Sequence, residues 1–387
     1  MKVYLTAFII MIVGLFMAPL LSLKPNRLMP GDPGYLIDIA PLNDILLVLS
    51  LLVLFLIFAN LLSWNKHLKL FMCLILSAIF YKIITISGDV ALVRSEADFL
   101  ARTAFTTGFW LFVAGYIVVM MQAFATVIEK KYDIKLLIIL LTIAPVGLLF
   151  FNGGVGEISI FKELMSKQDR FLLEFKNHLL ISGSASFSAI LIGIPLGIYS
   201  FRHQRLSERI FGLLNIVQTI PSIALFGFLI APFAWLASKS DFLDSVGFSG
   251  IGFAPAITAL ILYGLLPIVR NTYAGISSID PSVVESAKGM GMTSGQILIK
   301  IQLPVSMPLL MNGIRVSFVQ CIGNTAVAAL VGAGGFGLFI FQGLGQSAVD
   351  MVLLCAIPTI LLAVFADTIM QFIIKLTSPK GMDYDTD

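Results

Sequence analysis

The sequence predicts an all-α polytopic membrane protein with about ten transmembrane helices. Its mean hydropathy is +0.98, and 58% of its residues are hydrophobic while only 12% are charged. A soluble chain covers its surface with polar groups, so this composition excludes an ordinary soluble domain. The apolar runs are continuous and about 20 residues long, as membrane-spanning helices require, whereas barrel strands would be short and alternating.

The predicted spans form two groups of five, one on each side of residue 153. They begin near Val3, Ile45, Leu68, Phe105, Leu136, Leu179, Ile210, Pro255, Leu310 and Val352. We expect residues 1–152 to be an accessory membrane region and residues 153–175 to be an extracytoplasmic connecting segment with a short helix. The first apolar run lacks a small-x-small cleavage site before Lys24, so we interpret it as a retained helix and not as a signal peptide.

Glycine and proline are concentrated in the second group of spans, for example at Gly193, Pro195, Pro267 and Pro358. Small residues let helices approach closely, and prolines kink helices where neighbours or a water-filled cavity satisfy the freed carbonyls. Membrane helices carry more of both residues in any case, so composition alone leaves a structural explanation open. We predict a translocation path in this half, with candidate lining residues Gln218, Pro221, Asn271 and Asn324.

A charged segment with several glycines, residues 280–305, lies between two spans of the second group. Asp280 is a good helix N-cap, and Pro281 falls at the first helical position, where its missing N–H costs nothing. The helix is expected to run through Glu285 and to end at Gly291, which tolerates the positive φ common at that place.

A second short helix is predicted directly after this glycine. Thr293 and Gln296 have the spacing of a capping box, and Leu303-Pro304 are expected to end the helix. The segment should therefore be a helix-turn-helix elbow on one membrane face, shaped to fit a groove in a soluble partner.

The spacing of this elbow resembles the EAA loop of permease subunits of binding-protein-dependent ABC importers. The triplet Glu285-Ser286-Ala287 is followed after three residues by Gly291. After nine further residues comes the final hydrophobic set, which consists of Ile301, Leu303 and Pro304. Ser286 replaces the family's first alanine, one small residue for another. Segments 215–233, 266–293 and 331–344 are similar to the osmoprotectant branch, and the resemblance covers roughly residues 176–375.

The resemblance implies a five-helix, type I (MetI-like) permease core at 176–377, with 280–305 as the cytoplasmic loop that couples it to the ATPase, and a cytoplasmic tail at 378–387. It further implies two ATPase subunits, a separate extracytoplasmic solute-binding protein and a second permease, either this chain again or a shorter paralogue. In that branch the cargo is glycine betaine, choline, carnitine or a similar quaternary amine. The chain itself would catalyse no reaction, and we expect no cofactor, metal or nucleic acid.

The distribution of charge predicts the orientation in a bacterial cytoplasmic (inner) membrane. If the elbow is cytoplasmic and the spans alternate, the inside loops hold Lys66, Lys69, Lys130, Lys131, Lys135, Arg202, Arg205, Arg209, Lys288, Lys300, Lys375 and Lys380. The outside loops hold the acids Asp89, Glu96, Asp98, Glu157, Glu163, Asp169, Glu174, Asp241 and Asp244. Basic residues favour the cytoplasmic side, so both termini should lie inside.

Residues 332–337, GAGGFG, match a dinucleotide-binding pattern, but we reject this interpretation. The segment follows a span and not a strand, and the first acid after it, Asp350, comes too early to bind a ribose. The chain also has no G-x-x-x-x-G-K-[ST] phosphate loop. If ATP drives transport, another subunit must bind it.

The remaining reactive residue types are better explained by structure than by chemistry. Cys73, Cys321 and Cys355 lie in apolar runs without paired spacing, as small core residues do. Lys82, Arg315 and Asp367 also lie in apolar runs; we expect Lys82 to reach the outer interface, and the other two to pair or to support the base of the elbow.

Two other function classes fit this sequence less well. An ion-coupled secondary transporter predicts unpaired carboxylates at the membrane midplane and inverted repeats, and neither is clear in the sequence. A membrane-embedded enzyme predicts a polar catalytic cluster at one membrane face, which the sequence also lacks. An ATP-driven permease is therefore the preferred interpretation.

Overall fold

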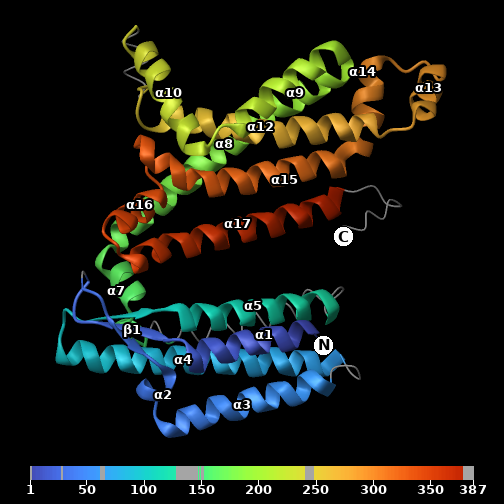
Figure 1. The fold of residues 1–387 in the computed structure, drawn as a ribbon. Coiled ribbons are helices and arrows are strands. Elements are labelled where there is room, and N and C mark those ends of the chain that lie inside the picture. Colours follow the sequence, from blue (N-terminus) through green and yellow to red (C-terminus); the bar gives the residue numbers. More distant parts are fainter. Residues whose placement is uncertain are drawn as a thin grey trace. The chain divides into compact units, whose positions relative to one another are not determined.

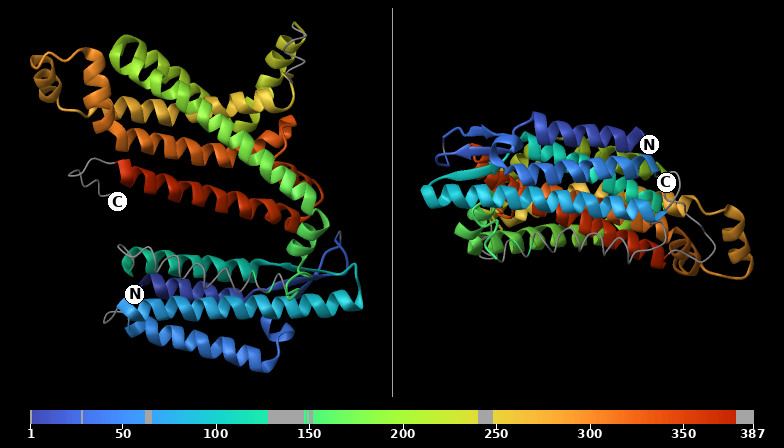
Figure 2. Two further views of the ribbon diagram at one scale, coloured as in Figure 1. Left: turned by 180° about the vertical axis from the view of Figure 1, so that it is seen from behind. Right: turned by 90° about the horizontal axis from the view of Figure 1, so that it is seen from below.

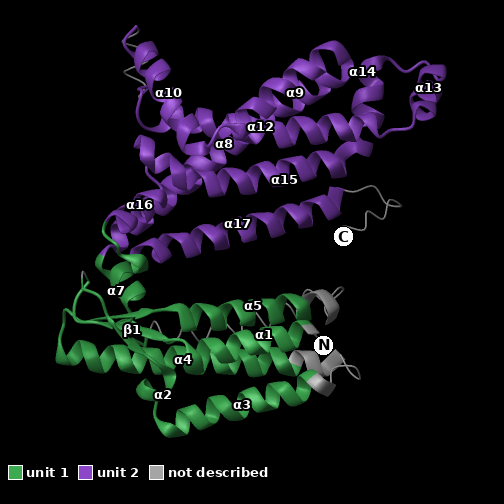
Figure 3. Cartoon of the chain, viewed as in Figure 1, with its two compact units in different colours: residues 1–166, 346–350 green, residues 167–345, 351–387 purple. Residues whose placement is uncertain are grey.

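The computed structural model describes residues 2–27, 29–61, 66–127, 147, 149, 152–239 and 248–377. The chain divides into two compact units (Figure 3). Unit 1 comprises residues 1–166 and 346–350, and unit 2 comprises residues 167–345 and 351–387. The predicted N-terminal region, 1–152, lies in unit 1. The predicted connecting segment, 153–175, spans the division, because the long helix that opens unit 2 begins at Gln168.

Unit 1 is a set of long helices with a small sheet at one end of them (Figure 1). The three-stranded antiparallel sheet has the order β2-β1-β3, and Leu21 of β1 pairs with both Gly34 of β2 and Phe105 of β3. The elements are α1 (Lys2–Ile12), the π-helical η1 (Val13–Met17), β1 (Leu21–Lys24), β2 (Asp32–Gly34), α2 (Leu36–Ile39), α3 (Leu42–Leu61), α4 (Lys66–Ala97), β3 (Arg102–Phe105), α5 (Thr107–Val127) and α7 (Ser159–Ser166).

Glycines allow the first segment of unit 1 to approach α5 closely. A Cβ on Gly14 would lie 2.6 Å from the carbonyl oxygen of Gly108, and a Cβ on Gly115 would lie 2.5 Å from Cγ of Met11. Membrane helices gain packing contacts where small residues bring backbones together. Around this contact Phe8 stacks on Phe55, with ring centroids 5.9 Å apart.

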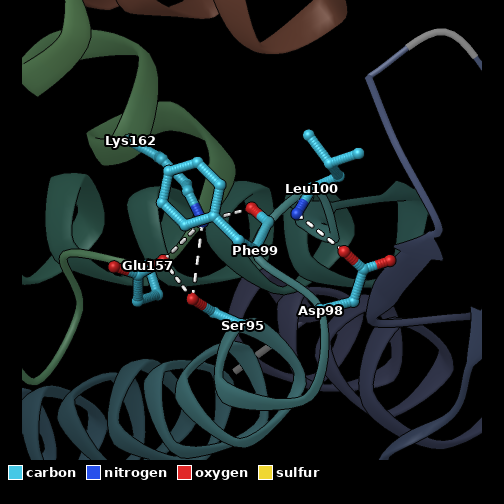
Figure 4. Close-up of polar contacts among 6 residues, drawn as sticks. All are labelled: Ser95, Asp98, Phe99, Leu100, Glu157 and Lys162. Carbon is cyan, nitrogen blue, oxygen red and sulfur yellow. Dashed lines mark hydrogen bonds and ion pairs between the residues drawn. The ribbon is translucent and has the colours of Figure 1, made fainter.

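Charged groups connect the ends of the unit 1 helices. The ammonium of Lys162 in α7 lies 2.6 Å from Oε2 of Glu157 and 3.2 Å from the carbonyl oxygen of Phe99, while Ser95 donates a 2.6 Å hydrogen bond to the same Glu157 oxygen (Figure 4). These hydrogen bonds, first from Lys162 and then from Ser95, lower the pKa of Glu157 below its ordinary value. They tie the end of α4 to α7.

Lys82 of α4 forms an ion pair with an acid of the preceding helix. Its ammonium lies 2.8 Å from Oδ1 of Asp44 at the start of α3. The sequence alone does not reveal this partner, because Asp44 is 38 residues earlier in the chain and only the packing of α3 against α4 brings the two together.

Unit 2 is built around α12, which packs against both α8 and α15 (Figure 1 and Figure 2). Glycines again set the close approaches: a Cβ on Gly197 of α8 would lie 2.6 Å from Cβ of Thr272, and one on Gly264 of α12 would lie 2.6 Å from Oγ of Ser317. The elements are α8 (Gln168–Arg202), α9 (Gln204–Thr219), α10 (Ser222–Ala237), α12 (Phe253–Ser277), α13 (Pro281–Gly289), α14 (Ser294–Ile297), η2 (Leu298–Gln302), α15 (Leu303–Ala328), η3 (Ala329–Val331), α16 (Gly337–Gly345) and α17 (Val349–Thr377).

The prediction of an all-α membrane protein is confirmed. In the described ranges six helices are long and apolar enough to span a membrane, and the bent pair α9 and α10 makes up to seven. Two shorter apolar helices, Val3–Met17 and Thr107–Ala123, coincide with further predicted spans. The predicted span near Leu136 falls outside the described residues. The count of about ten is compatible with this inventory, and all three cysteines are buried, as expected.

Candidate functional site

The elbow begins with the N-cap that the sequence predicts. Oδ1 of Asp280 accepts a 2.8 Å hydrogen bond from the backbone N–H of Ser282, and Pro281 opens α13. This backbone hydrogen bond stabilises the carboxylate and lowers the pKa of Asp280 below its ordinary value. The charge therefore persists at the positive end of the helix dipole, where an acid is favoured.

A Schellman turn ends α13 at Gly291. The N–H of Met292 donates to the carbonyl of Ala287 at 3.1 Å, and the N–H of Gly291 donates to the carbonyl of Lys288 at 2.9 Å. This pattern requires a left-handed residue after the helix, and the φ of Gly291 is +83°. A side chain at this position would be strained even though nothing lies within 4 Å of a built Cβ.

The capping box of the second helix is also present. Thr293 N–H donates to Oε1 of Gln296 at 2.9 Å, and the Gln296 N–H donates to Oγ1 of Thr293 at 3.3 Å. These reciprocal bonds fix the start of α14 two residues after the glycine turn. The direction of the chain through the elbow is thus set by local sequence.

The predicted end of this second helix is wrong. α14 continues through the π-helical η2 into α15, which begins at Leu303, so Leu303-Pro304 open a long helix instead of ending a short one. Proline lacks an N–H and is tolerated in the first turn of a helix as readily as it ends one. The chain instead changes direction between α14 and α15 (Figure 1), where the wider π-helical turn lies.

The elbow presents both a charge and apolar side chains to its surroundings. Glu285 and Ser286 are exposed, and Glu285 has no hydrogen bond or ion pair within the described ranges. Met290 is 75% exposed and Ile299 67% exposed. Ala287 is fully buried. A protruding surface of this kind can insert apolar groups into a groove while its carboxylate meets a basic group.

The other predicted residues of this loop lie at the elbow's return to α15. Ile301 and Leu303 are partly buried, and Pro304 is exposed. Leu303 packs with the apolar cluster around Leu310 and Ile268. The final hydrophobic set therefore connects the elbow to the α12–α15 packing.

Unit 2 also contains a broken span, α9 followed by α10, bent by 107°. The break lies at Ile220-Pro221, and Tyr263 of α12 holds it: the phenol donates to the carbonyl of Ile220. Gln218 in turn donates a 2.6 Å hydrogen bond to the backbone carbonyl of Tyr263. Inside a membrane, freed backbone groups at such a break must find partners, and Tyr263 supplies one.

Only some of the four predicted path residues lie together. Gln218 and Pro221 flank the same break, and Gln320 of α15 donates to Gln218 Oε1 at 3.4 Å. Asn324 is four residues beyond Gln320 and so lies on the same face of α15.

Asn271 is placed elsewhere. It bonds the carbonyl of Pro267 at 2.8 Å and packs beside Gly313. It is eight residues along α12 from Tyr263, or about 12 Å of helix rise. The sequence analysis missed Tyr263 and Gln320, although a polar tip inside an apolar run is a signal that could have found them.

The glycine-rich segment 332–337 has a structural role. Gly332, Gly334 and Gly335 all have positive φ, and the segment follows a helix, as the rejection of nucleotide binding assumed. Gly335 N–H donates a 2.7 Å hydrogen bond to Oε2 of Glu174 in α8. Phe336 packs beside His178, with ring centroids 5.1 Å apart. The segment thus attaches α16 to α8.

Arg315 and Asp367, the two charged residues within apolar runs of unit 2, pair with each other. Arg315 Nε lies 2.5 Å from Asp367 Oδ1, and Nη2 lies 3.0 Å from Oδ2. Pairing was one of the two alternatives predicted for them. A carboxylate held by two guanidinium donors is poorly suited to relay protons, since its charge is already compensated.

Each half of the chain is similar to a known protein family. Residues 189–378 match the family described as binding-protein-dependent transport system inner membrane component. Residues 1–161 match the family described as ABC transporter permease YehY, N-terminal domain.

The relatives of the second half are transport proteins. The osmoprotectant import permease protein OsmW of Salmonella typhimurium is 38% identical over 205 residues, which cover 53% of this chain and 90% of that protein. The glycine betaine/carnitine/choline transport system permease protein OpuCD of Bacillus subtilis is 40% identical over 209 residues, which cover 54% of this chain and 84% of that protein.

Among solved structures, a chain of the inward-facing MetNI methionine ABC transporter is 23% identical, with a TM-score of 0.48, over 54% of this chain and 96% of that chain.

This protein is a transport component, and ATP is hydrolysed by a separate subunit. Residues 189–378 match the family model, and the two relatives are matched over most of their own length. The chain therefore belongs to the family of inner-membrane permease subunits of binding-protein-dependent ABC importers.

Proposed function

We propose that this permease carries a quaternary-amine osmoprotectant, such as glycine betaine, choline or carnitine, into the cell. The printed names of its relatives support this substrate class, since OsmW is an osmoprotectant import permease and OpuCD serves glycine betaine, carnitine and choline. The pore would be completed by a second permease, either another copy of this chain or a shorter paralogue. An extracytoplasmic solute-binding protein would deliver the substrate.

We further propose that residues 280–305 form the surface on which the ATPase docks and through which its movement reaches the permease. The observation that carries it is the exposed carboxylate of Glu285, which has no ion pair among the residues that the structure describes, on a helix whose two ends are fixed by Asp280 and Gly291. A rigid, protruding helix transmits a push better than a mobile loop, because less of the displacement is lost in reorganisation. Leu303 then passes the movement to the apolar cluster between α12 and α15.

The broken span is the element of the path on which this movement would act. Gln218 and Pro221 lie at the break, and Tyr263 connects it to α12. A displacement of α12 would alter both hydrogen bonds and with them the angle between α9 and α10. Asn324 and Asn271 remain candidate path residues on α15 and α12, respectively.

The accessory and orienting features complete the proposal. Residues 1–152 act as an accessory membrane region, 153–175 as an extracytoplasmic connection, 176–377 as the permease core and 378–387 as a cytoplasmic tail. Both termini face the cytoplasm. This orientation places the basic side chains of Arg202, Arg205 and Arg209 on the inside, as the charge rule favours.

Uptake measurements test the coupling proposal. The complete importer is reconstituted in vesicles with ATP inside, the binding protein outside and labelled glycine betaine as substrate. Glu285→Ala should leave the chain folded and inserted, yet reduce ATP-driven uptake and ATPase association by about tenfold, as expected for losing one charge-assisted contact. The matched control is Glu96→Ala, which removes an exposed glutamate from unit 1 and should have no effect.

Three results would contradict the proposal. Normal uptake and normal ATPase association in Glu285→Ala would refute the coupling role of this residue. Uptake that continues without ATP but stops when ion gradients collapse would favour an ion-coupled transporter. If none of the three amines, betaine, choline and carnitine, is transported, the substrate class is refuted but the role of residues 280–305 in coupling to the ATPase is not.

A further inference from the structure

Unit 1 contains a cavity of about 590 Å³ at the end of its helices where the sheet lies. Its walls come from the strands β1 and β3, the first turn of α5 and the short stretch 349–350 that clusters with unit 1. The lining residues most relevant here are Ser22, Lys24, Phe105, Trp110 and Asp350. None of the functional residues described above lines this cavity.

Aromatic rings form one wall of the cavity. The Trp110 indole meets the ring of Phe109 edge-on at 5.1 Å, and Phe109 in turn stacks on Phe105 at 3.8 Å. These contacts fix the rings of Trp110 and Phe105 at the edge of the sheet. Tryptophan is the strongest aromatic partner for a cation, and a quaternary ammonium group, which cannot donate N–H hydrogen bonds, depends on such contacts.

Asp350 adds a negative charge to the same cavity. Its side chain is largely buried, and Oδ2 accepts a 2.7 Å hydrogen bond from Ser159. The other carboxylate oxygen has no hydrogen bond within the described part of the chain. A carboxylate beside aromatic rings favours an ammonium ligand over an anionic or neutral one.

One basic side chain, that of Lys24, also lines the cavity. Lys24 is close enough to Asp350 to interact electrostatically, but the two do not form an ion pair, so space remains between them. The register Lys24↔Arg102 and Ser22↔Ala104 places Lys24, Arg102 and Ser22 on one face of the sheet. Nε and Nη1 of Arg102 have no hydrogen-bond partner in the described part of the chain, and its charge acts on Glu157 and Asp350, so this face of the sheet has a positive potential.

We infer that this cavity binds a small zwitterionic amine. The ammonium group lies against Trp110 and Phe105 and near Asp350, and the carboxylate lies toward Lys24. A ligand with both charges can interact with both Asp350 and Lys24, whereas a simple cation would be attracted by Asp350 and repelled by Lys24. The inference depends on the proposed function only for the choice of glycine betaine as the probe.

The binding test uses the full chain in lipid nanodiscs, without ATPase or binding protein. Trp64→Phe and Trp235→Phe leave Trp110 as the only tryptophan, so its emission reports on this cavity. Glycine betaine should change the emission saturably, and choline, which lacks the carboxylate, should bind about tenfold more weakly. No saturable change with glycine betaine would overturn the inference.

Variants then test separately the residue expected to bind the ammonium group, Asp350, and the residue expected to bind the carboxylate, Lys24. Asp350→Asn keeps an oxygen that can accept from Ser159, and it should weaken both ligands roughly 2- to 30-fold. Lys24→Met should weaken glycine betaine alone, so that it binds like choline. Asp38→Asn, which removes an exposed acid of unit 1 outside the cavity, should match the parent. Unchanged betaine affinity in Lys24→Met would refute the zwitterion assignment.

A second measurement does not depend on the tryptophan signal. Equilibrium binding of radiolabelled glycine betaine to Trp110→Leu should fall roughly 2- to 30-fold below wild type, with circular dichroism confirming the fold. ATP-driven uptake by the complete importer is measured in parallel. Wild-type uptake without cavity binding overturns this inference alone, whereas cavity binding without betaine uptake overturns the proposed substrate and leaves the site.

Discussion

Arg315 and Asp367 form a bidentate ion pair that joins α15 to α17. The two N–O distances are 2.5 and 3.0 Å, and Gln371 donates a third hydrogen bond to the carboxylate at 2.8 Å. Their side chains are 28% and 29% exposed within the chain. Because both lie in apolar helices, each charge is tolerated chiefly through the other.

Exchanging the two charges of this pair should restore stability that is lost when only one of them is changed. Asp367→Ala leaves an uncompensated guanidinium and should destabilise the protein by about 1–3 kcal/mol, less than a fully buried pair would. The double variant Arg315→Asp with Asp367→Arg should be more stable than either of these two single variants. Thermal unfolding in detergent measures this as a double-mutant cycle. Additive losses in the double variant would show that the two charges act independently.

The glycine turn of the elbow predicts a position-specific effect. Gly291→Val must adopt a φ near +83°, which costs about 1–3 kcal/mol locally and should misdirect α14. ATP-driven uptake should be lost while membrane insertion is normal. Gly295→Ala is the matched control, because this residue lies in α14 with a helical φ and open space around it. Equal uptake in the two variants would contradict the role of the turn.

Tyr263 should control the broken span through its hydroxyl group. Tyr263→Phe keeps the ring but leaves the carbonyl of Ile220 without this donor, at a cost of about 1 kcal/mol. Substrate-stimulated transport should slow several-fold, while assembly with the ATPase remains normal. Tyr273→Phe is a matched control on the same helix, since Tyr273 contacts neighbouring rings and not the break. An unchanged transport rate in Tyr263→Phe would argue against a role for the bend.

The Glu157 cluster predicts an acid-dependent loss of stability. Its pKa is lowered in the folded state, so its contribution is present above the unfolded value near 4.5 and is lost as pH falls through the folded value. Thermal unfolding temperatures should therefore fall more between pH 7 and pH 3.5 in wild type than in Glu157→Gln. A parallel decline in both proteins would mean that other carboxylates dominate this range.

Cysteine labelling tests the proposed orientation. In a variant without Cys73, Cys321 and Cys355, single cysteines replace chosen residues and react with a membrane-impermeant reagent added outside. Positions 169 and 241 should react, and positions 205 and 131 should not. Positions 131 and 241 lie outside the described residues, so this experiment extends beyond the structure. Outside labelling at position 205 would overturn the topology and the cytoplasmic assignment of the elbow.

Local interactions explain the parts of the elbow that were predictable. The Asp280 cap, the positive φ of Gly291 and the capping box at Thr293 each involve residues at most a few positions apart, so residue identity and spacing determine them. The one local error, at Leu303-Pro304, arose because proline suits the first turn of a helix as well as the position after its end. Sequence alone could not distinguish these two uses.

The sequence by itself determined the membrane-spanning class, the elbow and the family resemblance, because apolar run length and short-range spacing carry that information. Only the tertiary structure decided which distant side chains meet. Tyr263 reaches a carbonyl 43 residues away, Arg315 pairs across 52 residues, and Glu174 binds a backbone amide 161 residues later. Such contacts depend on which helix faces pack together, and that packing is set by close approaches at glycines such as Gly197 and Gly264, which no local pattern specifies.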